Sequence, residues 1–321
     1  MNVKRSSILS RAVASATVGL MLLAGCSSST SGSGNGASSS PSASSEASAA
    51  ESGEHPSRIV AVSSETADMA LLLAGPEAMV AIAAASQSPS MGMVPDLANQ
   101  VAETLPAGIT PDAEQILAYE PDLVLTTSRH GGEKSTNEQL ASAGVEMVTF
   151  ESDDFNSPEA YADALRTTGD VLGYPEEAEQ YATELLASIE EIDAQKSDKS
   201  PRVLVLMVRG GKVMAMASNN MLPGLALRAG ATDATTEAGI TSTAPIDGEL
   251  LVRANPDLIL LEDFQGGGEG PFQELLNSPA VADVPAIANQ NIHVIEMTEA
   301  SSLAGINLPV GYQKVMDIVS E

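Results

Sequence analysis

The chain has 321 residues and a formal net charge of −28 at pH 7, because 43 acidic residues stand against 15 lysines and arginines. Such acidity argues against nucleic acids and anionic lipid headgroups as partners, since both are negatively charged. The sequence contains one cysteine, which excludes a framework of intramolecular disulfides.

The first 25 residues have the pattern of an export signal. Lys4 and Arg5 precede an apolar run that is too short and too rich in alanine and serine for a good membrane span. The run ends in LLAGC at 22–26, which resembles the lipobox of bacterial lipoproteins. That resemblance implies a lipid on Cys26 and attachment to the outer face of the cell membrane. An ordinary secreted protein is the alternative.

Residues 26–55 are predicted to form a tether. The segment is rich in serine, glycine and alanine and has almost nothing apolar to bury. The folded body is therefore expected from residue 56 to residue 321. No stretch of that body is long and apolar enough to cross a bilayer, and its length is sufficient for two lobes with separate cores.

Strand and helix patterns alternate between residues 56 and 156. The first helix illustrates the boundary signals, with Ser63 or Ser64 as its N-cap and Gly75 as its stop. Regular alternation of this kind predicts a lobe with a parallel sheet. The expected strands are IVAV, AMVAIAA, DLVLTT and VEMVTF, and the expected helices are SSETADMALLLAG, DAEQILAYE and STNEQLASAG.

A helical stretch at 157–200 follows. Ser157 and Pro158 begin one helix, Gly173 ends it, and PEEAEQYATELLASIEEIDAQ then continues as about 20 helical residues. A helix of that length is roughly 30 Å long, which matches the size of a small domain. We therefore expect this segment to connect two lobes.

The alternating pattern restarts at 201–321. The strands PRVLVLMV, PDLILLE and NIHVIEM alternate with the helices MLPGLALRAGA, DGELLVRA, FQELLN and LPVGYQKVMDIVSE. The predicted fold class is therefore α/β, with two Rossmann-like lobes that have central parallel sheets and are joined by one long rigid helix.

One unit occurs in both lobes. DAEQILAYEPDLVLTT begins at Asp112, and DGELLVRANPDLILLE begins at Asp247. Each copy has a glutamate two residues after its first aspartate, namely Glu114 and Glu249. An acidic residue in the first turn also stabilises the helix dipole, which is the alternative reason for its presence.

These segments, together with RIVAVSSETADMALLLAG and LGYPEEAEQYATELL, resemble the substrate-binding proteins of bacterial ABC importers. The similarity is to the class that binds iron complexes and cobalamin. It implies a monomer in which one rigid helix joins two lobes and the ligand lies in the cleft between them. It also implies docking of one acidic residue on each lobe, here Glu114 and Glu249, onto arginines of the permease, which works with its ATPase.

His130 is the leading candidate for a contact with the ligand. It follows the strand DLVLTT and precedes two glycines, and in haem-binding members of the family this loop supplies or adjoins an axial ligand. Neutral imidazole is a common ligand of haem iron. A solvated loop histidine is the alternative. Many family members have a tyrosine ligand near the position of TSTAPIDG, and none stands there in this sequence.

Basic and sulfur-containing side chains complete the predicted site. Cations on loops at the cleft are expected to pair with haem propionates or an anionic ferric siderophore, and thioethers can contact iron. The candidates are Arg129, Lys134, Arg209, Lys212, Met91 and Met93. Haem is ranked slightly above a ferric siderophore, and cobalamin third. No catalytic motif is found, so an enzyme is not expected; a structural lipoprotein is the alternative from another class.

Overall fold

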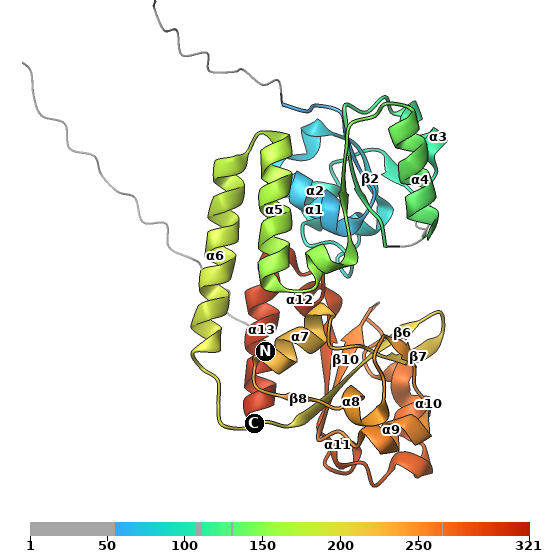
Figure 1. Ribbon diagram of the computed structural model, residues 1–321, viewed down its shortest axis with the longest axis vertical. Helices are drawn as coiled ribbons and strands as arrows, with labels where there is room; N and C mark the ends of the chain where they lie inside the picture. Colours follow the sequence, from blue (N-terminus) through green and yellow to red (C-terminus); the bar gives the residue numbers. More distant parts are fainter. Residues whose placement is uncertain (1–54, 107–110, 130, 265) are drawn as a thin grey trace, which may run out of the picture. The chain divides into compact units, whose positions relative to one another are not determined.

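The computed structural model describes residues 55–106, 111–129, 131–264 and 266–321 (Figure 1). Cys26 and His130 therefore lie outside the described residues. Residues 52–321 group as one unit. No helix in the described ranges combines the length and the apolarity that a membrane crossing requires.

The first lobe is built on a five-stranded parallel sheet with the strand order β3-β2-β1-β4-β5. The prediction of a parallel sheet is confirmed, and the sequence patterns missed only the two-residue strand β3. The strands are β1 (Ile59–Ala61), β2 (Met79–Ala83), β3 (Thr104–Leu105), β4 (Leu123–Thr127) and β5 (Met147–Phe150). The helices are α1 (Ser64–Ala74), α2 (Pro95–Ala98), α3 (Ala113–Ala118) and α4 (Gly131–Ser142).

The connector consists of two helices, α5 (Pro158–Leu172) and α6 (Pro175–Asp193), which run side by side (Figure 1). Gly173 has a φ of 82°, which permits the tight reversal between them. Gly169 allows their close approach, because a Cβ at that position would lie 2.3 Å from the Cβ of Ala178. The longer helix, α6, leads into the second lobe.

The second lobe contains a mixed sheet with the order β11-β10-β6-β7-β9. Strands β6, β10 and β11 are parallel, whereas β7 is antiparallel to β6 and to β9. The strands are β6 (Arg202–Arg209), β7 (Lys212–Ala215), β8 (Thr232–Asp233), which pairs with β6, β9 (Ala244–Pro245), β10 (Leu258–Asp263) and β11 (Ile292–Glu296). The helices are α7 (Met221–Arg228), α8 (Thr235–Ala238), α9 (Gly248–Ala254), α10 (Gln273–Leu276), α11 (Pro285–Ala288), α12 (Met297–Ala300) and α13 (Leu308–Ser320).

The antiparallel part of this sheet begins with a tight hairpin. Arg209 and Lys212 pair across it, and Gly210 and Gly211 between them have φ values of 58° and 74°. Two central residues with positive φ are typical of the turn that matches the twist of paired strands. Arg209 and Lys212, which the sequence placed on a cleft loop, therefore belong to two paired strands on either side of a hairpin turn.

The repeated unit has the same structural role in both lobes. In the first lobe, the carboxylate of Asp122 accepts a hydrogen bond of 3.0 Å from the backbone N–H of Arg58, at the start of β1. In the second lobe, the carboxylate of Asp257 accepts a hydrogen bond of 3.0 Å from the backbone N–H of Arg202, at the start of β6. Each bond joins the beginnings of two neighbouring parallel strands. The aspartate of each Pro-Asp pair is thus explained by strand alignment at the amino edge of each sheet.

The repeated helices also begin and end alike. Asp112 and Asp247 are the N-caps of α3 and α9 and accept hydrogen bonds from backbone N–H groups of the first turn. Glu120 and Asn255 follow these helices with φ values of 48° and 44°. The two copies therefore match in backbone conformation as well as in sequence.

One apolar core extends from the first sheet through the connector to the second sheet. It contains Leu125 of β4, Leu165 of α5, Leu185 of α6, Val205 of β6 and Val315 of α13. The opposite faces of the two sheets have separate cores. A shared core across the connector favours a stiff joint, because close-packed interiors resist deformation.

Arg228 of α7 ties the second lobe to the connector. Its guanidinium donates to Asp193 at the end of α6 at 2.8–3.0 Å and to Glu159 at the start of α5. The Tyr312 hydroxyl of α13 donates to the same Asp193. Although burial opposes ionisation of Asp193, the hydrogen bonds from Arg228 and Tyr312 lower the pKa of its carboxyl.

Replacing this arginine, Arg228→Ala, should lower the free energy of unfolding by about 2–3 kcal/mol, because it leaves a partly buried carboxylate without its cation. Urea unfolding at pH 7 measures the change. Arg166→Ala is the matched control, since Arg166 pairs with the exposed Asp163 and Glu179 on the connector surface. Equal losses for the two variants would show that the Arg228 network does not hold the joint together.

Candidate functional site

A cavity of about 220 Å³ lies between the two lobes at the carboxyl ends of their parallel strands. The first lobe contributes the loop after β2, and the second lobe contributes the residues that end β10 and β11 and those that follow them. Ligands of α/β proteins commonly bind at this edge of a sheet. The lining residues are Pro89, Ser90, Asp263, Gly266, Glu296 and Thr298.

Two carboxylates define the second-lobe wall of the cavity. Asp263 and Glu296 are the final residues of β10 and β11 and are register partners in the parallel ladder. The Asp263 carboxylate accepts hydrogen bonds from the backbone N–H groups of Gly267 (3.0 Å) and Gly268 (2.8 Å). These bonds fold the glycine-rich loop back onto the end of β10.

Glu296 has a similar local role. It is the N-cap of α12, and its side chain accepts a hydrogen bond from the backbone N–H of Glu299. The backbone N–H of Glu296 in turn donates a hydrogen bond of 3.2 Å to the Glu299 carboxylate. Lys314 of α13 donates to the same Glu299 carboxylate at 2.8 Å. Glu296 itself is exposed, so its charge remains at the cavity.

The carboxyl edge of the first-lobe sheet also has a buried carboxylate beside Arg129, although neither residue lines the cavity. Glu65 in the first turn of α1 accepts from the Arg129 guanidinium at 2.8 Å and from the Ser302 hydroxyl of the second lobe at 3.0 Å. Burial tends to raise the pKa of Glu65, but the charge of Arg129 and these hydrogen bonds lower it on balance. The Glu65–Ser302 bond is a direct polar contact between the two lobes.

Arg129 is thus committed to first-lobe acids. Its backbone N–H donates to the Glu133 carboxylate at 2.6 Å, and its guanidinium lies 3.9 Å from the same carboxylate. Its predicted role as a free cation for a propionate therefore requires it to exchange partners.

The two predicted methionines lie on the loop after β2. Met93 is buried, and its sulfur accepts a hydrogen bond from the backbone N–H of Ile306 at 3.2 Å. Gly305 makes this approach possible, because a Cβ there would lie 2.2 Å from the sulfur. Met93 is therefore engaged in packing between the lobes. Met91 is half-buried and precedes it on the loop.

The remaining predicted cations lie elsewhere. Lys134 is exposed in the first turns of α4, and Arg209 and Lys212 are exposed at the β6–β7 hairpin. Among the described residues that line the cavity, none is basic. The structure consequently does not gather the predicted cations around one ligand position.

Besides Glu65 and Glu133, the sequence patterns did not indicate two further buried carboxyl groups. Glu262, one residue before the end of β10, is 3% exposed, and burial raises its pKa to about 7. Asp68 of α1 is 2% exposed, and burial outweighs hydrogen bonds from the Met93 and Val94 backbones to raise its pKa to about 7. The only signal for Glu262 in the sequence was an acid at the end of an otherwise apolar strand.

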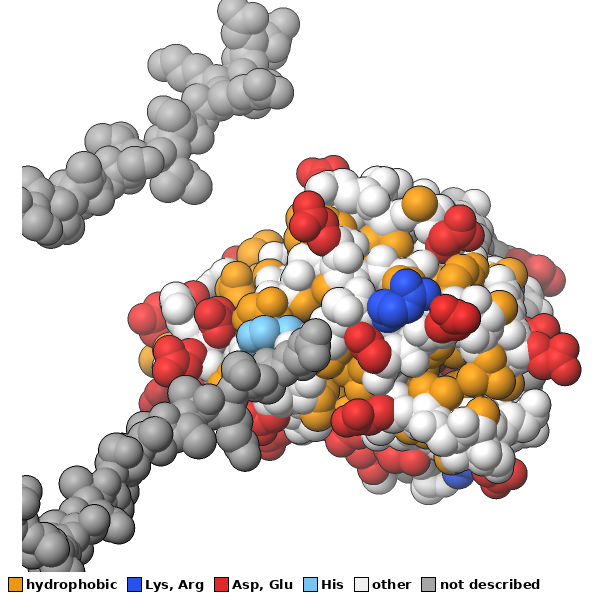
Figure 2. All heavy atoms as spheres, turned by 90° about the horizontal axis from the view of Figure 1, so that it is seen from above, with side chains coloured by type: hydrophobic (Ala, Val, Ile, Leu, Met, Phe, Trp, Pro, Cys, Tyr) orange, Lys and Arg blue, Asp and Glu red, His pale blue; other side chains and the backbone are white. Residues whose placement is uncertain are grey.

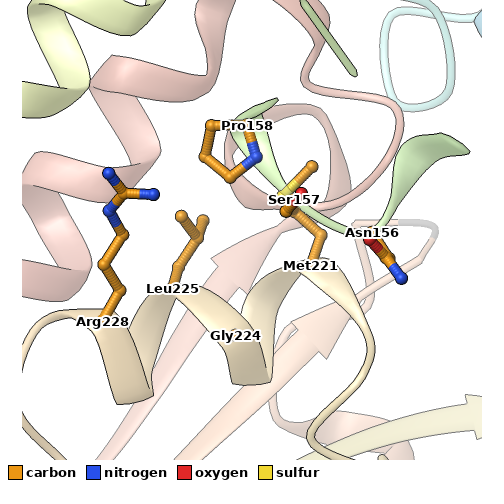
Figure 3. Close-up of a pocket in the computed structure, with 7 residues that line it drawn as sticks. All are labelled: Asn156, Ser157, Pro158, Met221, Gly224, Leu225 and Arg228. Atoms are coloured by element: carbon orange, nitrogen blue, oxygen red, sulfur yellow. The ribbon is translucent and has the colours of Figure 1, made fainter. Parts of the chain in front are cut away.

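A second cavity of about 190 Å³ lies beside the connector (Figure 3). Pro158 at the start of α5 faces Leu225 and Met221 of α7, and the Arg228 side chain lies at one end of the group. Because Arg228 is held by Asp193 and Glu159, this cavity belongs to the joint between the lobes.

The matched glutamates are exposed on the two lobes. Glu114 lies in α3 and Glu249 in α9, and both helices lie on the side of their lobes away from the connector (Figure 1). The Glu249 side chain is 83% exposed and accepts from Arg253 at 3.3 Å. Acidic side chains also predominate over basic ones on the face shown in Figure 2.

A family model described as "Periplasmic binding protein" matches residues 59–298. Among curated proteins, the ferric-anguibactin-binding protein FatB of Vibrio anguillarum is 28% identical over 171 residues. That alignment covers 52% of this chain and 52% of the relative, so this chain matches about half the length of FatB.

Solved structures share the fold. The periplasmic heme-binding protein RhuT from Roseiflexus sp. RS-1, in apo form, is 22% identical with a TM-score of 0.69, covering 82% of this chain and 97% of its own. A periplasmic heme-binding protein from Pseudomonas aeruginosa is 25% identical with a TM-score of 0.64, covering 81% and 91%. These likenesses confirm the expected α/β architecture with two lobes.

Proposed function

Because this chain belongs to the periplasmic binding protein family, we propose that it captures an iron complex outside the cytoplasm and delivers it to an ABC importer. The observation that carries the proposal is the cavity at the carboxyl ends of both sheets, lined by residues of both lobes. A ligand held there contacts two lobes that a continuous core joins. The FatB relative and the heme-binding structures, by their names, support an iron complex as the ligand.

Attachment to the membrane is the second part of the proposal. The LLAGC motif ending at Cys26 and the serine-rich tether that follows support a lipid anchor on the outer face of the cell membrane. The tether would keep the folded body close to its permease without embedding it. Glu114 and Glu249 then serve as the docking carboxylates, because both are exposed and occupy equivalent positions on the two lobes.

Haem and a ferric siderophore are the two candidate ligands. The sequence prediction ranks haem slightly higher and assigns His130 to the iron, with Arg129 or Lys134 near a propionate. That assignment stays a prediction, since His130 lies outside the described residues. The partners of Arg129 within the first lobe weaken its part in the haem hypothesis.

Titration of the mature protein with haemin and with ferric siderophores tests the function. We expect saturable binding of at least one iron complex with a stoichiometry of one. Ser90→Trp should abolish it by filling the cavity, because Ser90 lines the first-lobe wall. Ser135→Trp, on the exposed surface of α4, is the matched control. Binding that survives Ser90→Trp unchanged would place the ligand outside this cleft.

A further inference from the structure

We infer that Met93 is a positioning residue of the proposed ligand site, because its side chain fixes one wall of the cavity against the chain segment that forms the other. This inference rests on the proposed function, since it concerns affinity for the ligand of the same cavity. Met93 is buried and does not itself line the cavity. Its effect therefore passes through Pro89 and Ser90, the first-lobe wall residues. This role differs from the direct contact with the ligand that the sequence suggested.

The loop after β2 forms a compact turn at 88–92. The carbonyl of Ser88 accepts hydrogen bonds from the backbone N–H groups of Met91 at 3.0 Å and Gly92 at 2.8 Å. Gly92 also lies against an earlier part of the loop, since a Cβ there would be 2.1 Å from the Ser86 carbonyl oxygen. The first-lobe wall residues lie within this turn. Because the turn is closed by its own hydrogen bonds, we expect it to move as one piece.

Met93 holds the end of this turn to the first lobe. Its backbone N–H donates to the carboxylate of Asp68 in α1 at 2.8 Å. Both residues are buried. A buried donor or acceptor that loses its partner is costly, so this bond resists breaking. The turn is thereby fixed to α1 at the residue that follows it.

The side chain of Met93 extends to the second lobe. Its sulfur accepts a hydrogen bond from the backbone N–H of Ile306 at 3.2 Å. A thioether is a weak acceptor, so close packing must supply most of this contact. Gly305 provides the space, because a Cβ there would lie 2.2 Å from the sulfur and 2.8 Å from the Tyr161 hydroxyl of α5. A larger residue at 305 would therefore displace the Met93 side chain.

The contact point is close along the chain to the opposite wall of the cavity. Thr298 lines that wall and belongs to α12. The backbone N–H of Ala304 donates to the carbonyl of Ser301 at 3.0 Å, which keeps the chain compact after α12. The short helix η6 (Gly305–Asn307) follows directly and contains Ile306. Met93 therefore connects the segment that carries one wall to the segment that carries the other.

A fixed pair of walls favours binding. A ligand that touches both walls loses affinity when one of them must be ordered during binding, because that ordering costs free energy. Small displacements of supporting residues have the same effect on a preorganised site. Truncating Met93 should therefore weaken binding although no residue that lines the cavity is changed.

Affinity measurements on the mature protein test this role. The probe is haemin, or a ferric siderophore if haemin does not bind the parent. Met93→Ala should lower affinity about tenfold, mainly through faster release. Met93→Leu keeps most of the side-chain volume, so it should stay within about threefold of the parent and leave the absorption spectrum of the bound probe unchanged.

Met69→Ala is the matched control. Met69 is also buried in the first lobe, and its sulfur accepts from the Thr168 hydroxyl of the connector at 3.7 Å. It lies on α1, outside the turn that carries the first-lobe wall residues. We expect this variant to lose stability as Met93→Ala does, and to keep the affinity of the parent. A purely structural role of Met93 would make the two alanine variants behave alike.

Hydrogen exchange provides a readout that needs no ligand. In Met93→Ala, the amides of Met91 and Gly92 should exchange at least about tenfold faster, because the turn is no longer held at its end. Gly305→Ala displaces the sulfur from the other side and should have the same effect on these amides and on affinity. It also serves if Met93→Ala does not fold. Met69→Ala should leave the exchange of both amides unchanged.

Four results would overturn the inference. They are unchanged exchange in both Met93→Ala and Gly305→Ala, faster exchange with unchanged affinity, equal losses of affinity in Met93→Ala and Met69→Ala, and an altered spectrum in Met93→Leu, which would indicate direct contact with iron. If no iron complex binds the parent, the proposed function fails. Exchange then still decides whether Met93 holds the turn, since faster exchange supports that contact and unchanged exchange rejects it.

Discussion

Reversing the charge of the two carboxylates proposed to dock onto the permease, Glu114→Arg with Glu249→Arg, should reduce uptake of the iron complex at least about 100-fold while ligand affinity stays unchanged. Two arginines facing arginines of a permease would place like charges against each other, and each such contact costs several kcal/mol. Both side chains are exposed, and neither lines the cavity. Uptake assays in cells and ligand titration of the purified protein measure the two effects separately.

The control for this experiment preserves the change in net charge. Glu138→Arg with Glu274→Arg alters one exposed helix residue on each lobe, on α4 and α10. Normal uptake by that variant would show that the position of the carboxylates matters. Should the Glu114/Glu249 variant transport normally, or lose ligand binding, docking through these residues is the wrong assignment.

Replacing the buried carboxyl of β10, Glu262→Gln, should make the protein more stable at pH 8 by up to about 3 kcal/mol. Burial raises the pKa of Glu262 from 4.5 to about 7. The unfolded chain therefore releases this proton at a lower pH than the folded chain does. The neutral carboxyl makes its full contribution to the free energy of unfolding below pH 4.5. That contribution falls as the pH rises towards 7 and changes little above that.

Urea unfolding at pH 4.5 and pH 8 measures this effect. The parent should lose more stability between the two pH values than Glu262→Gln does, because only the parent must ionise the buried carboxyl of Glu262. Glu274→Gln serves as the control, since it removes an exposed carboxyl from the same lobe. Asp68 has a pKa raised in the same way, so the variant should retain part of the pH dependence. If the free energy of unfolding changes by the same amount between the two pH values in the parent and in Glu262→Gln, the raised pKa of Glu262 is wrong.

The fold was largely predictable because its signals are local. The caps at Ser63, Asp112, Ser157 and Asp247 all accept hydrogen bonds from the helices that follow them. Helix α6 begins at Pro175 as expected. The hairpin of β6 and β7 escaped prediction, because a Gly-Gly turn between short apolar runs also fits a loop after a parallel strand.

The candidate site was less predictable because its charges are set by partners distant in sequence. Arg129 was expected to be free for a ligand, yet it meets Glu65 from another helix. Met93 was expected to face the ligand, yet its sulfur meets Ile306 from the end of the chain. No local pattern reports such pairs, since they form only when the two lobes come together.

By itself, the sequence determined the order of helices and strands, the repeated unit with Glu114 and Glu249, and the resemblance to the substrate-binding proteins of ABC importers; the export signal and its lipobox stay predictions. These features depend on residue type and spacing along the chain. Only the tertiary structure decided which side chains line the cleft and which charges remain there. Asp263 and Glu296 are far apart in sequence and become neighbours through strand register, while Glu262 becomes buried through packing. The charge that a ligand meets is therefore a property of the assembled sheets.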